Sequence, residues 1–421
     1  MGYASCLRGI RSGAEYPPDT VMNLDPVDNR PVEIVLDVER IRREKPDGAW
    51  YHPERKDMWR FGSLLPLDIA DPDDARHIVT LGEGYTPLLA YPDHDLAKKA
   101  GFRLQVKEEG RAYPGYGRNP TQSFKDRGMA MAVSMARRLG LKKLAVPTQG
   151  NAGDALAEYG RAAGLEVAIV MPDDTPMPIL GKVAAYAQIY PSVHLELVKG
   201  TIREAGLRVK ERYLPEGYFS VATFQEPGWR IEGKKTMGLE LAEPAEPGGA
   251  WSLPDVIVYP TGGGTGILGM WKAFDELEAL GLIDGRRPRI VSVQSARTAP
   301  LVRAFEAGLG DAEPVQAGDT LATGLNVPGG VGHFRVLEIL YASEGCALGI
   351  EEAAIEETLR HTFKTKGWWI SPEGAAGLAA LPSLVDRGVI RAGDRVVTFN
   401  TGSFEKYLPN LRHLLRQDIR S

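Results

Sequence analysis

The chain has 421 residues, of which 43% are hydrophobic and 25% are charged, and its net charge is −5. This composition is typical of a globular protein with two domains or one large α/β unit, and the negative charge argues against nucleic acid or an anionic membrane as the main partner. The two cysteines, Cys6 and Cys346, are too few for a disulfide framework or a four-ligand zinc site, so we predict no metal.

The sequence shows neither a signal peptide nor a membrane-spanning segment. The first ten residues lack the charged-then-apolar pattern of a signal peptide. No apolar run approaches the roughly 20 residues that span a bilayer. We therefore expect a soluble, cytoplasmic protein that does not associate with membranes.

Residues 1–80 are rich in Pro, Asp and Arg and have only weak periodicity. A short strand is predicted at Glu33–Leu36 and a helical turn at Val38–Arg43. We interpret this stretch as an N-terminal extension that wraps on a core or serves as a dimer arm. The segment that follows, Leu-Gly-Glu-Gly-Tyr-Thr-Pro-Leu at 81–88, has the Gly and Pro of a turn.

The run Asn-Pro-Thr-Gln-Ser-Phe-Lys-Asp-Arg-Gly at 119–128 opens a long helical pattern and places Lys125 between an aromatic residue and an acid. A lysine that is partly desolvated has a lowered pKa and becomes a nucleophile toward an aldehyde. The alternative is a solvated lysine at a helix N-terminus. Only the surrounding sequence can decide between them.

A regular pattern follows, with continuous apolar strands separated by a helix. The predicted elements are a strand at Lys143–Pro147, a helix at Ala152–Ala163 and a strand at Glu166–Met171. Continuous rather than alternating apolar strands favour a parallel sheet that is covered on both faces. Between the first strand and the helix lies Thr-Gln-Gly-Asn-Ala-Gly (148–153), whose Asn151 would by itself be interpreted as a helix N-cap.

A second α/β unit is predicted in the C-terminal half. Its elements are strands at Asp255–Tyr259, Arg289–Gln294 and Arg395–Phe399, and a helix at Ile267–Leu280. Two α/β lobes with a cleft between them are the natural assembly, and ligands bind at the carboxyl ends of such strands.

A glycine-rich loop, Thr-Gly-Gly-Gly-Thr-Gly at 261–266, lies between a strand and a helix. Its backbone N–H groups and the following helix N-terminus favour a phosphate. The spacing Gly264-x-Gly266-x-x-Gly269 also satisfies the dinucleotide fingerprint, which keeps an NAD-dependent oxidoreductase open. That fingerprint requires an acid at the end of the next strand, whereas Asp284 precedes this strand and Gln294 ends it. Glycines needed only for tight strand–helix packing are a third interpretation.

Taken together and in order, segments from about residue 80 to 407 resemble the pyridoxal-phosphate (PLP) enzymes of the tryptophan synthase β type. The segments at 82–88 and 119–128 resemble those of threonine synthase most. Arg-Ile-Glu-Gly-Lys-Lys-Thr at 230–236 is similar to the family's Arg-Ile-Glu-Gly-Gln-Lys-Thr. The resemblance implies an α/β fold of type II, in which each of two lobes has a largely parallel sheet covered by helices.

The same resemblance implies the domains and the cofactor site. Residues 81–118 and 223–421 would form the large PLP-binding domain, and 119–222 a smaller α/β domain. Lys125 would carry the Schiff base with pyridoxal 5'-phosphate, Asn151 would contact the phenolic oxygen and Thr401 the ring nitrogen. A hydroxyl at that nitrogen does not force its protonation, which suits eliminations and replacements. The remaining implied cofactor residues are Phe124, Gly262, Gly263, Gly264, Thr265 and Gly266.

The reaction implied is that of threonine synthase, a lyase that converts O-phosphohomoserine and water to threonine and phosphate. A homodimer is usual among such enzymes, and the partner would be a small amino-acid substrate. Alternatives on the same cofactor are β-elimination of the serine/threonine dehydratase type and β-replacement of the cysteine or cysteate synthase type. An inert binding protein on this fold is a further alternative, against which the intact Lys125 argues. Implied substrate contacts are Lys107, Arg118, Ser123, Thr148, Gln149, Gly150 and Arg230.

Several segments depart from the family pattern. A loop at 110–118 is inserted, Gln149 stands where relatives have Ser or Thr, and 225–229 lacks the Asn that precedes Arg230 in relatives. Ser-Phe-Glu-Lys-Tyr at 403–407 replaces a His-Gly-Leu-Lys-Asp run, and only Cys6 is left of a zinc ribbon. Because the departures surround the substrate and leave the cofactor segments unchanged, the resemblance predicts the cofactor more directly than the substrate.

Overall fold

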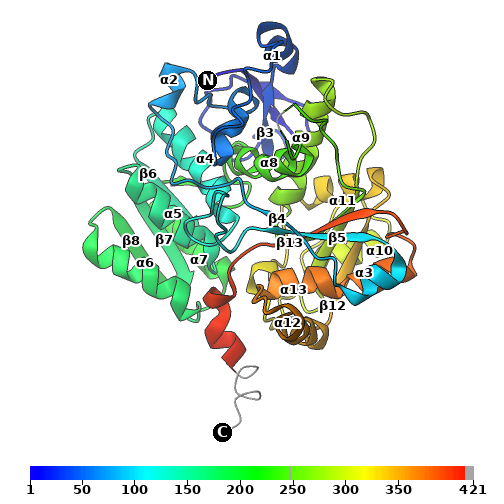
Figure 1. Ribbon diagram of the computed structural model, residues 1–421. Coiled ribbons are helices and arrows are strands. Elements are labelled where there is room, and N and C mark those ends of the chain that lie inside the picture. Colours follow the sequence, from blue (N-terminus) through cyan, green and yellow to red (C-terminus); the bar gives the residue numbers. More distant parts are fainter. Residues whose placement is uncertain (247, 413–421) are drawn as a thin grey trace.

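The computed structural model describes residues 1–246 and 248–412. Within these residues the strands form three sheets, which belong to an N-terminal unit and two α/β lobes (Figure 1). The fold class predicted from the sequence is confirmed, since both lobes have helices packed on sheets that are wholly or largely parallel.

The larger lobe contains a six-stranded sheet in the order β12-β11-β10-β13-β5-β4. All neighbours are parallel except the edge strand β4, which is antiparallel to β5. Every residue of β10 is buried, which explains its continuous apolar sequence. The strands are β4 (Leu88–Ala90), β5 (Arg103–Glu108), β10 (Val256–Pro260), β11 (Arg289–Ser295), β12 (Cys346–Ile350) and β13 (Arg395–Asn400).

The smaller lobe contains a parallel sheet in the order β8-β7-β6-β9. Helices α5, α6 and α7 lie beside its strands in Figure 1, and α5 also packs against α4. The strands are β6 (Lys143–Pro147), β7 (Glu166–Pro172), β8 (Val193–Val198) and β9 (Phe219–Ser220). The predicted strand at Lys143–Pro147 has the observed bounds, and the helix predicted from Ala152 begins one residue earlier.

Helices connect the strands and cover both sheets. The α-helices are α1 (Val38–Glu44), α2 (Pro72–Ala75), α3 (Asp95–Ala100), α4 (Lys125–Arg138), α5 (Asn151–Ala162), α6 (Met177–Ile189), α7 (Ile202–Arg208), α8 (Trp229–Ala242), α9 (Thr265–Ala279), α10 (Pro300–Glu306), α11 (His333–Ala342), α12 (Glu352–Lys366), α13 (Pro372–Ala379) and α14 (Leu381–Asp386). Segments of 3-10 helix are η1 (Met58–Leu64), η3 (Thr323–Leu325) and η4 (Phe404–Tyr407), and η2 (Val209–Tyr213) is a π-helical turn.

The N-terminal residues form an antiparallel sheet, β2-β1-β3, from β1 (Ala4–Gly9), β2 (Glu15–Tyr16) and β3 (Val32–Leu36). β3 alternates buried and half-buried residues, as expected for a strand with one face on a core. Val32 and Ile34 are fully buried, and Lys272 of α9 donates a hydrogen bond to the Ile34 carbonyl. The N-terminal sheet therefore packs on helices α8 and α9.

Helix α8 lies between α4 and α9 and is buried along its whole length. A side chain at Gly233 would put a Cβ atom 2.0 Å from the Arg127 carbonyl oxygen, so the backbones of α8 and α4 are in direct contact. Three helices packed this tightly fix the start of α4 relative to the start of α9. Those two helix starts carry Lys125 and the glycine loop.

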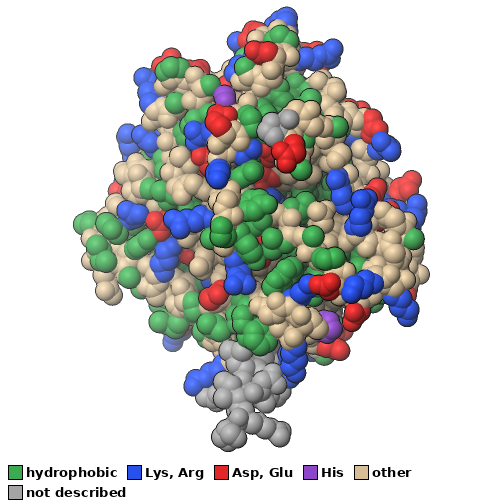
Figure 2. Space-filling model, viewed as in Figure 1, with side chains coloured by type: hydrophobic (Ala, Val, Ile, Leu, Met, Phe, Trp, Pro, Cys, Tyr) green, Lys and Arg blue, Asp and Glu red, His purple; other side chains and the backbone are tan. Residues whose placement is uncertain are grey.

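The surface agrees with the modest net charge. On the face drawn in Figure 2, cationic and anionic side chains are interspersed over both lobes. No helix among the residues that the structure describes is long and apolar enough to cross a membrane.

Candidate active site

A cavity opens where β10 and β13 end and where α4, α5 and α9 begin. It brings together residues that are up to 283 positions apart, from Phe124 to Tyr407. Every residue for which the sequence suggested a contact with the cofactor lines this cavity. They are Phe124, Lys125, Asn151, Gly262, Gly263, Gly264, Thr265, Gly266 and Thr401.

Lys125 is the first residue of α4 and is half-buried. Burial and, to a smaller extent, the positive charge of Arg230 lower the pKa of its amine to about 7, and the carboxylate of Glu373 opposes both effects. The Nζ atom lies 4.4 Å from the centroid of the Phe124 ring. An amine with this pKa is largely neutral just above pH 7 and can attack a carbonyl carbon.

The loop before Lys125 is fixed to the end of β13. The Phe124 N–H donates to the Thr401 carbonyl over 3.2 Å, and the Ser403 N–H donates to the Gln122 carbonyl over 2.9 Å. The Asp126 carboxyl accepts from both the backbone N–H (2.7 Å) and the hydroxyl (2.5 Å) of Thr121. Because these bonds join the segment before Lys125 to the end of β13, the position of Lys125 depends on both lobes.

The glycine loop has no room for side chains. Gly264 has φ +93°, and a Cβ atom there would lie 2.4 Å from a methyl group of Val336. At Gly266 a Cβ atom would lie 2.1 Å from the hydroxyl of Tyr259. The loop leads directly into the 15-residue helix α9, so backbone N–H groups and the helix N-terminus face the cavity. This arrangement suits an anion such as a phosphate.

Asn151 begins α5, and its amide orientation is set by Lys406. The Lys406 ammonium, which can only donate, binds Oδ1 of Asn151 over 2.8 Å. The amide nitrogen of Asn151 therefore points the other way and donates to the Tyr407 hydroxyl over 3.2 Å. A second acceptor in the cavity, such as a phenolate oxygen, could take the other hydrogen of the same amide.

Two buried polar groups in the cavity have unused bonding capacity. Among the residues that the structure describes, the Tyr259 hydroxyl and Oε2 of Glu373 have no hydrogen-bond partner, while Oε1 of Glu373 accepts from the Gly324 N–H over 2.8 Å. Burial raises the pKa of Glu373, and Tyr407 lies beside it. Unused buried polar groups indicate a polar ligand in the cavity.

The comparisons with known proteins decide which ligand this is. The sequence profile of the family described as "Pyridoxal-phosphate dependent enzyme" matches residues 79–402. The chain belongs to this family.

Curated relatives of this pyridoxal-phosphate dependent enzyme include the threonine synthase of Methanosarcina acetivorans, which is 31% identical over 95% of this chain and 92% of its own length. The threonine synthase of Methanocaldococcus jannaschii is 30% identical over 94% of this chain and 91% of its own. Among solved structures, the processed threonine deaminase isoform 2 of Solanum lycopersicum matches with a TM-score of 0.62 at 20% identity, covering 82% of this chain and 90% of its own. A fungal L-serine ammonia-lyase from Rhizomucor miehei matches with a TM-score of 0.60 at 18% identity, covering 77% of this chain and 98% of its own. These structures share the fold.

Pyridoxal 5'-phosphate is the cofactor of this enzyme, and the cavity fits it. The glycine cradle could hold the phosphate, which a side chain there would displace. Lys125 could bind the aldehyde carbon, Asn151 the phenolic oxygen and Thr401 the ring nitrogen. Tyr259, Glu373 and Tyr407 also line the cavity but were not among the residues we expected from the sequence.

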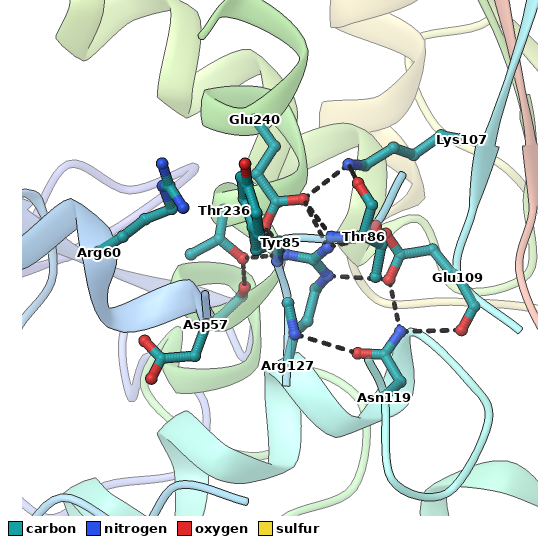
Figure 3. Close-up of polar contacts among 12 residues, drawn as sticks. Asp57, Arg60, Tyr85, Thr86, Lys107, Glu109, Asn119, Arg127, Thr236 and Glu240 are labelled. Atoms are coloured by element: carbon teal, nitrogen blue, oxygen red, sulfur yellow. Dashed lines mark hydrogen bonds and ion pairs between the residues drawn. The ribbon is translucent and has the colours of Figure 1, made fainter. Parts of the chain in front are cut away.

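The structure does not bring Lys107 to the cavity. Lys107 is buried and donates to the Thr86 carbonyl (2.6 Å) and to Glu240 (2.7 Å). Figure 3 shows that Glu240 also binds the guanidinium of Arg127, which pairs with Glu109 as well. This network joins β5, α4 and α8 and secures the first turn of α4, in which Lys125 lies.

The other suggested substrate residues differ in position. Arg118 is exposed on the inserted loop, and the Ser123 hydroxyl accepts from the Lys125 N–H over 3.2 Å. The Thr148 hydroxyl accepts from the Gly150 N–H over 3.0 Å and so shapes the turn that includes Gln149. Arg230 is buried close enough to Lys125 to lower its pKa.

The dinucleotide alternative finds no support in the structure. Asp284 is exposed and binds Arg286, and the Gln294 side chain is occupied by the backbone of Thr261 and Leu301. No acid at either place could hold a ribose. Within residues 1–246 and 248–412, no group of three His, Cys, Asp or Glu could hold a metal ion.

Proposed function

We propose that this enzyme converts O-phosphohomoserine and water to threonine and inorganic phosphate, with Lys125 as the residue that binds the cofactor and moves protons. The observation that carries the proposal is the position of Arg230. It is 1% exposed and is the largest electrostatic influence on Lys125 after burial.

The guanidinium of Arg230 retains donors for a ligand. One terminal nitrogen donates to the Val221 carbonyl over 3.0 Å and lies 3.4 Å from the hydroxyl of Thr223, which lines the cavity. Its Nε has no hydrogen-bond partner in the described parts of the chain. A planar guanidinium with free N–H groups suits the oxygens of a phosphate monoester. Two curated relatives named threonine synthase cover more than nine-tenths of this chain, which supports the same substrate.

The cofactor supplies an electron sink at the substrate's α-carbon. Lys125 supplies the base, because an amine with a pKa of about 7 can accept and return a proton at neutral pH. Loss of phosphate from the γ-carbon breaks a C–O bond, and water then adds to the β-carbon. Arg230 would hold the departing phosphate near the amine of Lys125.

Product analysis tests this proposal. The holoenzyme is incubated in turn with O-phosphohomoserine, serine and threonine, and inorganic phosphate, threonine and 2-oxo acids are measured. Threonine and phosphate released in equal amounts from O-phosphohomoserine are the expected result. A 2-oxo acid from serine or threonine, without phosphate release from O-phosphohomoserine, would replace the proposal with a β-elimination of the dehydratase type. That alternative is favoured only by the missing Asn before Arg230.

A further inference from the structure

Lys234 is a second lysine next to the cofactor site, in contact with two residues that line the cavity, Phe124 and Thr265. It lies one turn after Arg230 on α8 and is fully buried. Its Nζ donates to the hydroxyl of Thr265 over 2.5 Å and lies 5.2 Å from the centroid of the Phe124 ring. Lys125 approaches the same ring, with its Nζ 4.4 Å from the centroid. Lys234 therefore contacts the glycine loop at Thr265, the first residue of α9.

This lysine has no carboxylate partner. In the described part of the chain, no acid lies within ion-pair distance of Lys234, whereas the adjacent Lys235 pairs with Glu232 (2.5 Å) and Glu276 (2.8 Å). A buried ammonium group without a counter-ion is strongly unfavourable.

Two of the groups that face Lys234 are themselves cationic. Lys125 faces it from α4 and Arg230 from α8 itself, and together with burial they hold the pKa of Lys234 well below its usual range. The acid that opposes them, Glu226, precedes α8, and its own pKa is raised by burial to about 7. The cluster therefore has an excess of cations next to a loop that is shaped for an anion.

We propose that Lys234 provides the counter-charge for the phosphate of the cofactor and acts through the hydroxyl of Thr265. This role rests on the proposed function of the glycine loop. Because the Lys234 ammonium donates to Thr265 Oγ1, the hydroxyl hydrogen is free to donate to a phosphate oxygen in the loop. Lys234 is thus a positioning residue, and a phosphate dianion would supply the counter-ion that Lys234 does not find among the described residues.

The proposal makes cofactor affinity dependent on pH in a definite direction. Below the lowered pKa, Lys234 is charged and ready for the phosphate. Above it, binding must add a proton to Lys234, so the affinity falls as pH rises. Lys125 has the opposite effect, because only its neutral amine binds the aldehyde. Both effects occur in the wild type. Replacing Lys234 removes only the fall in affinity with rising pH that is due to Lys234.

The test compares Lys234→Gln and Lys234→Arg with the wild type and with Lys210→Gln, an exposed control. Equilibrium dialysis gives the dissociation constants of PLP and of pyridoxal, which lacks the phosphate. We expect Lys234→Gln to weaken PLP binding roughly 10- to 100-fold, the loss of one charge-assisted hydrogen bond, and to leave pyridoxal binding unchanged. Lys234→Arg retains most of the PLP affinity. The phosphorus-31 resonance of the bound cofactor should titrate at higher pH in Lys234→Gln.

Other outcomes would overturn the role of Lys234. Equal losses for PLP and pyridoxal would indicate a structural role, and unchanged PLP binding would exclude the counter-charge. Weaker inhibition by inorganic phosphate with unchanged PLP binding would assign the charge to the substrate's phosphate instead. A wild-type protein in which neither PLP nor pyridoxal binds Lys125 would refute the proposed function itself. Thermal unfolding of the apo variants provides a check on folding, because removing an unpaired buried charge should not lower their stability.

Discussion

The ammonium of Lys406 donates to Oδ1 of Asn151 over 2.8 Å and so joins the segment after β13 to the first residue of α5. The same ammonium pairs with Asp154 over 2.8 Å. The two residues belong to different lobes, and the cavity lies between those lobes. Lys406 thereby decides which atom of the Asn151 amide is presented to a ligand.

Replacing Lys406 with Met should release the Asn151 amide and weaken its bond to the phenolic oxygen of the cofactor. We expect a shifted absorption maximum of the bound cofactor and an activity loss of roughly tenfold or more, as for other residues that orient a ligand-binding group. Lys182→Met is the matched control, because Lys182 also pairs with Asp154, over 2.9 Å, but makes no bond to Asn151. An unchanged spectrum in Lys406→Met would show that Asn151 does not depend on it.

The lowered pKa of Lys125 predicts how covalent cofactor binding depends on pH. The rate at which the apoenzyme binds PLP covalently should rise with pH and level off above about 7, because only the neutral amine attacks. Removing the charge of Arg230 in Arg230→Gln should move the midpoint to higher pH. Stopped-flow absorbance measures the rate. A midpoint near the usual lysine value of about 10.4 in the wild type would contradict the effect of burial.

The ion-pair network around Arg127 should be a major source of stability. Arg127→Met leaves Glu109 and Glu240 buried beside a single cation, Lys107, and should lower the free energy of unfolding by about 3–5 kcal/mol. Urea unfolding of the apoenzyme measures this. Arg212→Met, at a partly exposed ion pair with Glu196, should cost about 1 kcal/mol or less. Similar losses in both variants would mean that the network adds no more than a surface pair.

Acid should weaken the same network. Burial by itself would raise the pKa of Glu240, but Arg127 and Lys107 lower it to about 2. A depressed carboxyl pKa stabilises the fold above the unfolded value of about 4.3, and this contribution is lost as pH falls toward 2. Stability should therefore decline with acidification over that interval, and less steeply in Glu240→Gln. Denaturant midpoints in a pH series measure both slopes, and equal slopes would contradict the assignment.

The tight packing of the glycine loop at 261–266 predicts that a side chain at Gly266 would clash with its neighbours. Gly266→Ala places a Cβ atom 2.1 Å from the Tyr259 hydroxyl, so the loop or the tyrosine must move. We expect PLP affinity to fall at least about tenfold and stability by about 1–3 kcal/mol. Gly206→Ala, where a Cβ atom meets nothing within 4 Å on α7, should instead gain up to about 1 kcal/mol. Equilibrium dialysis and thermal unfolding distinguish the two variants.

The fold was predictable where burial leaves a local pattern. Lys143–Pro147 lies inside a parallel sheet, buries its apolar centre and was predicted with its observed bounds. Lys125 was recognised because its neighbours form a contiguous run. The glycine loop and Asn151 were likewise found from segments of a few residues, and the structure brings all of them to one cavity.

The rest depends on contacts that no local pattern contains. Lys107 was expected near the substrate, yet its partner Glu240 is 133 residues away. Glu373 follows Ser-Pro at the start of α13 and has the sequence of an ordinary acidic first turn. Lys234 lies in a charged stretch typical of a solvated helix face, and only the packing of α8 between two helices buries it.

The most direct test of the central claim is to reduce the holoenzyme with borohydride, digest it and map the modified peptide by mass spectrometry. Reduction makes the bond between PLP and a lysine permanent. Our account predicts the modification on Lys125 and its absence in Lys125→Ala. Modification of Lys234, the other lysine at the cofactor site, or of no lysine at all would contradict the assignment of Lys125.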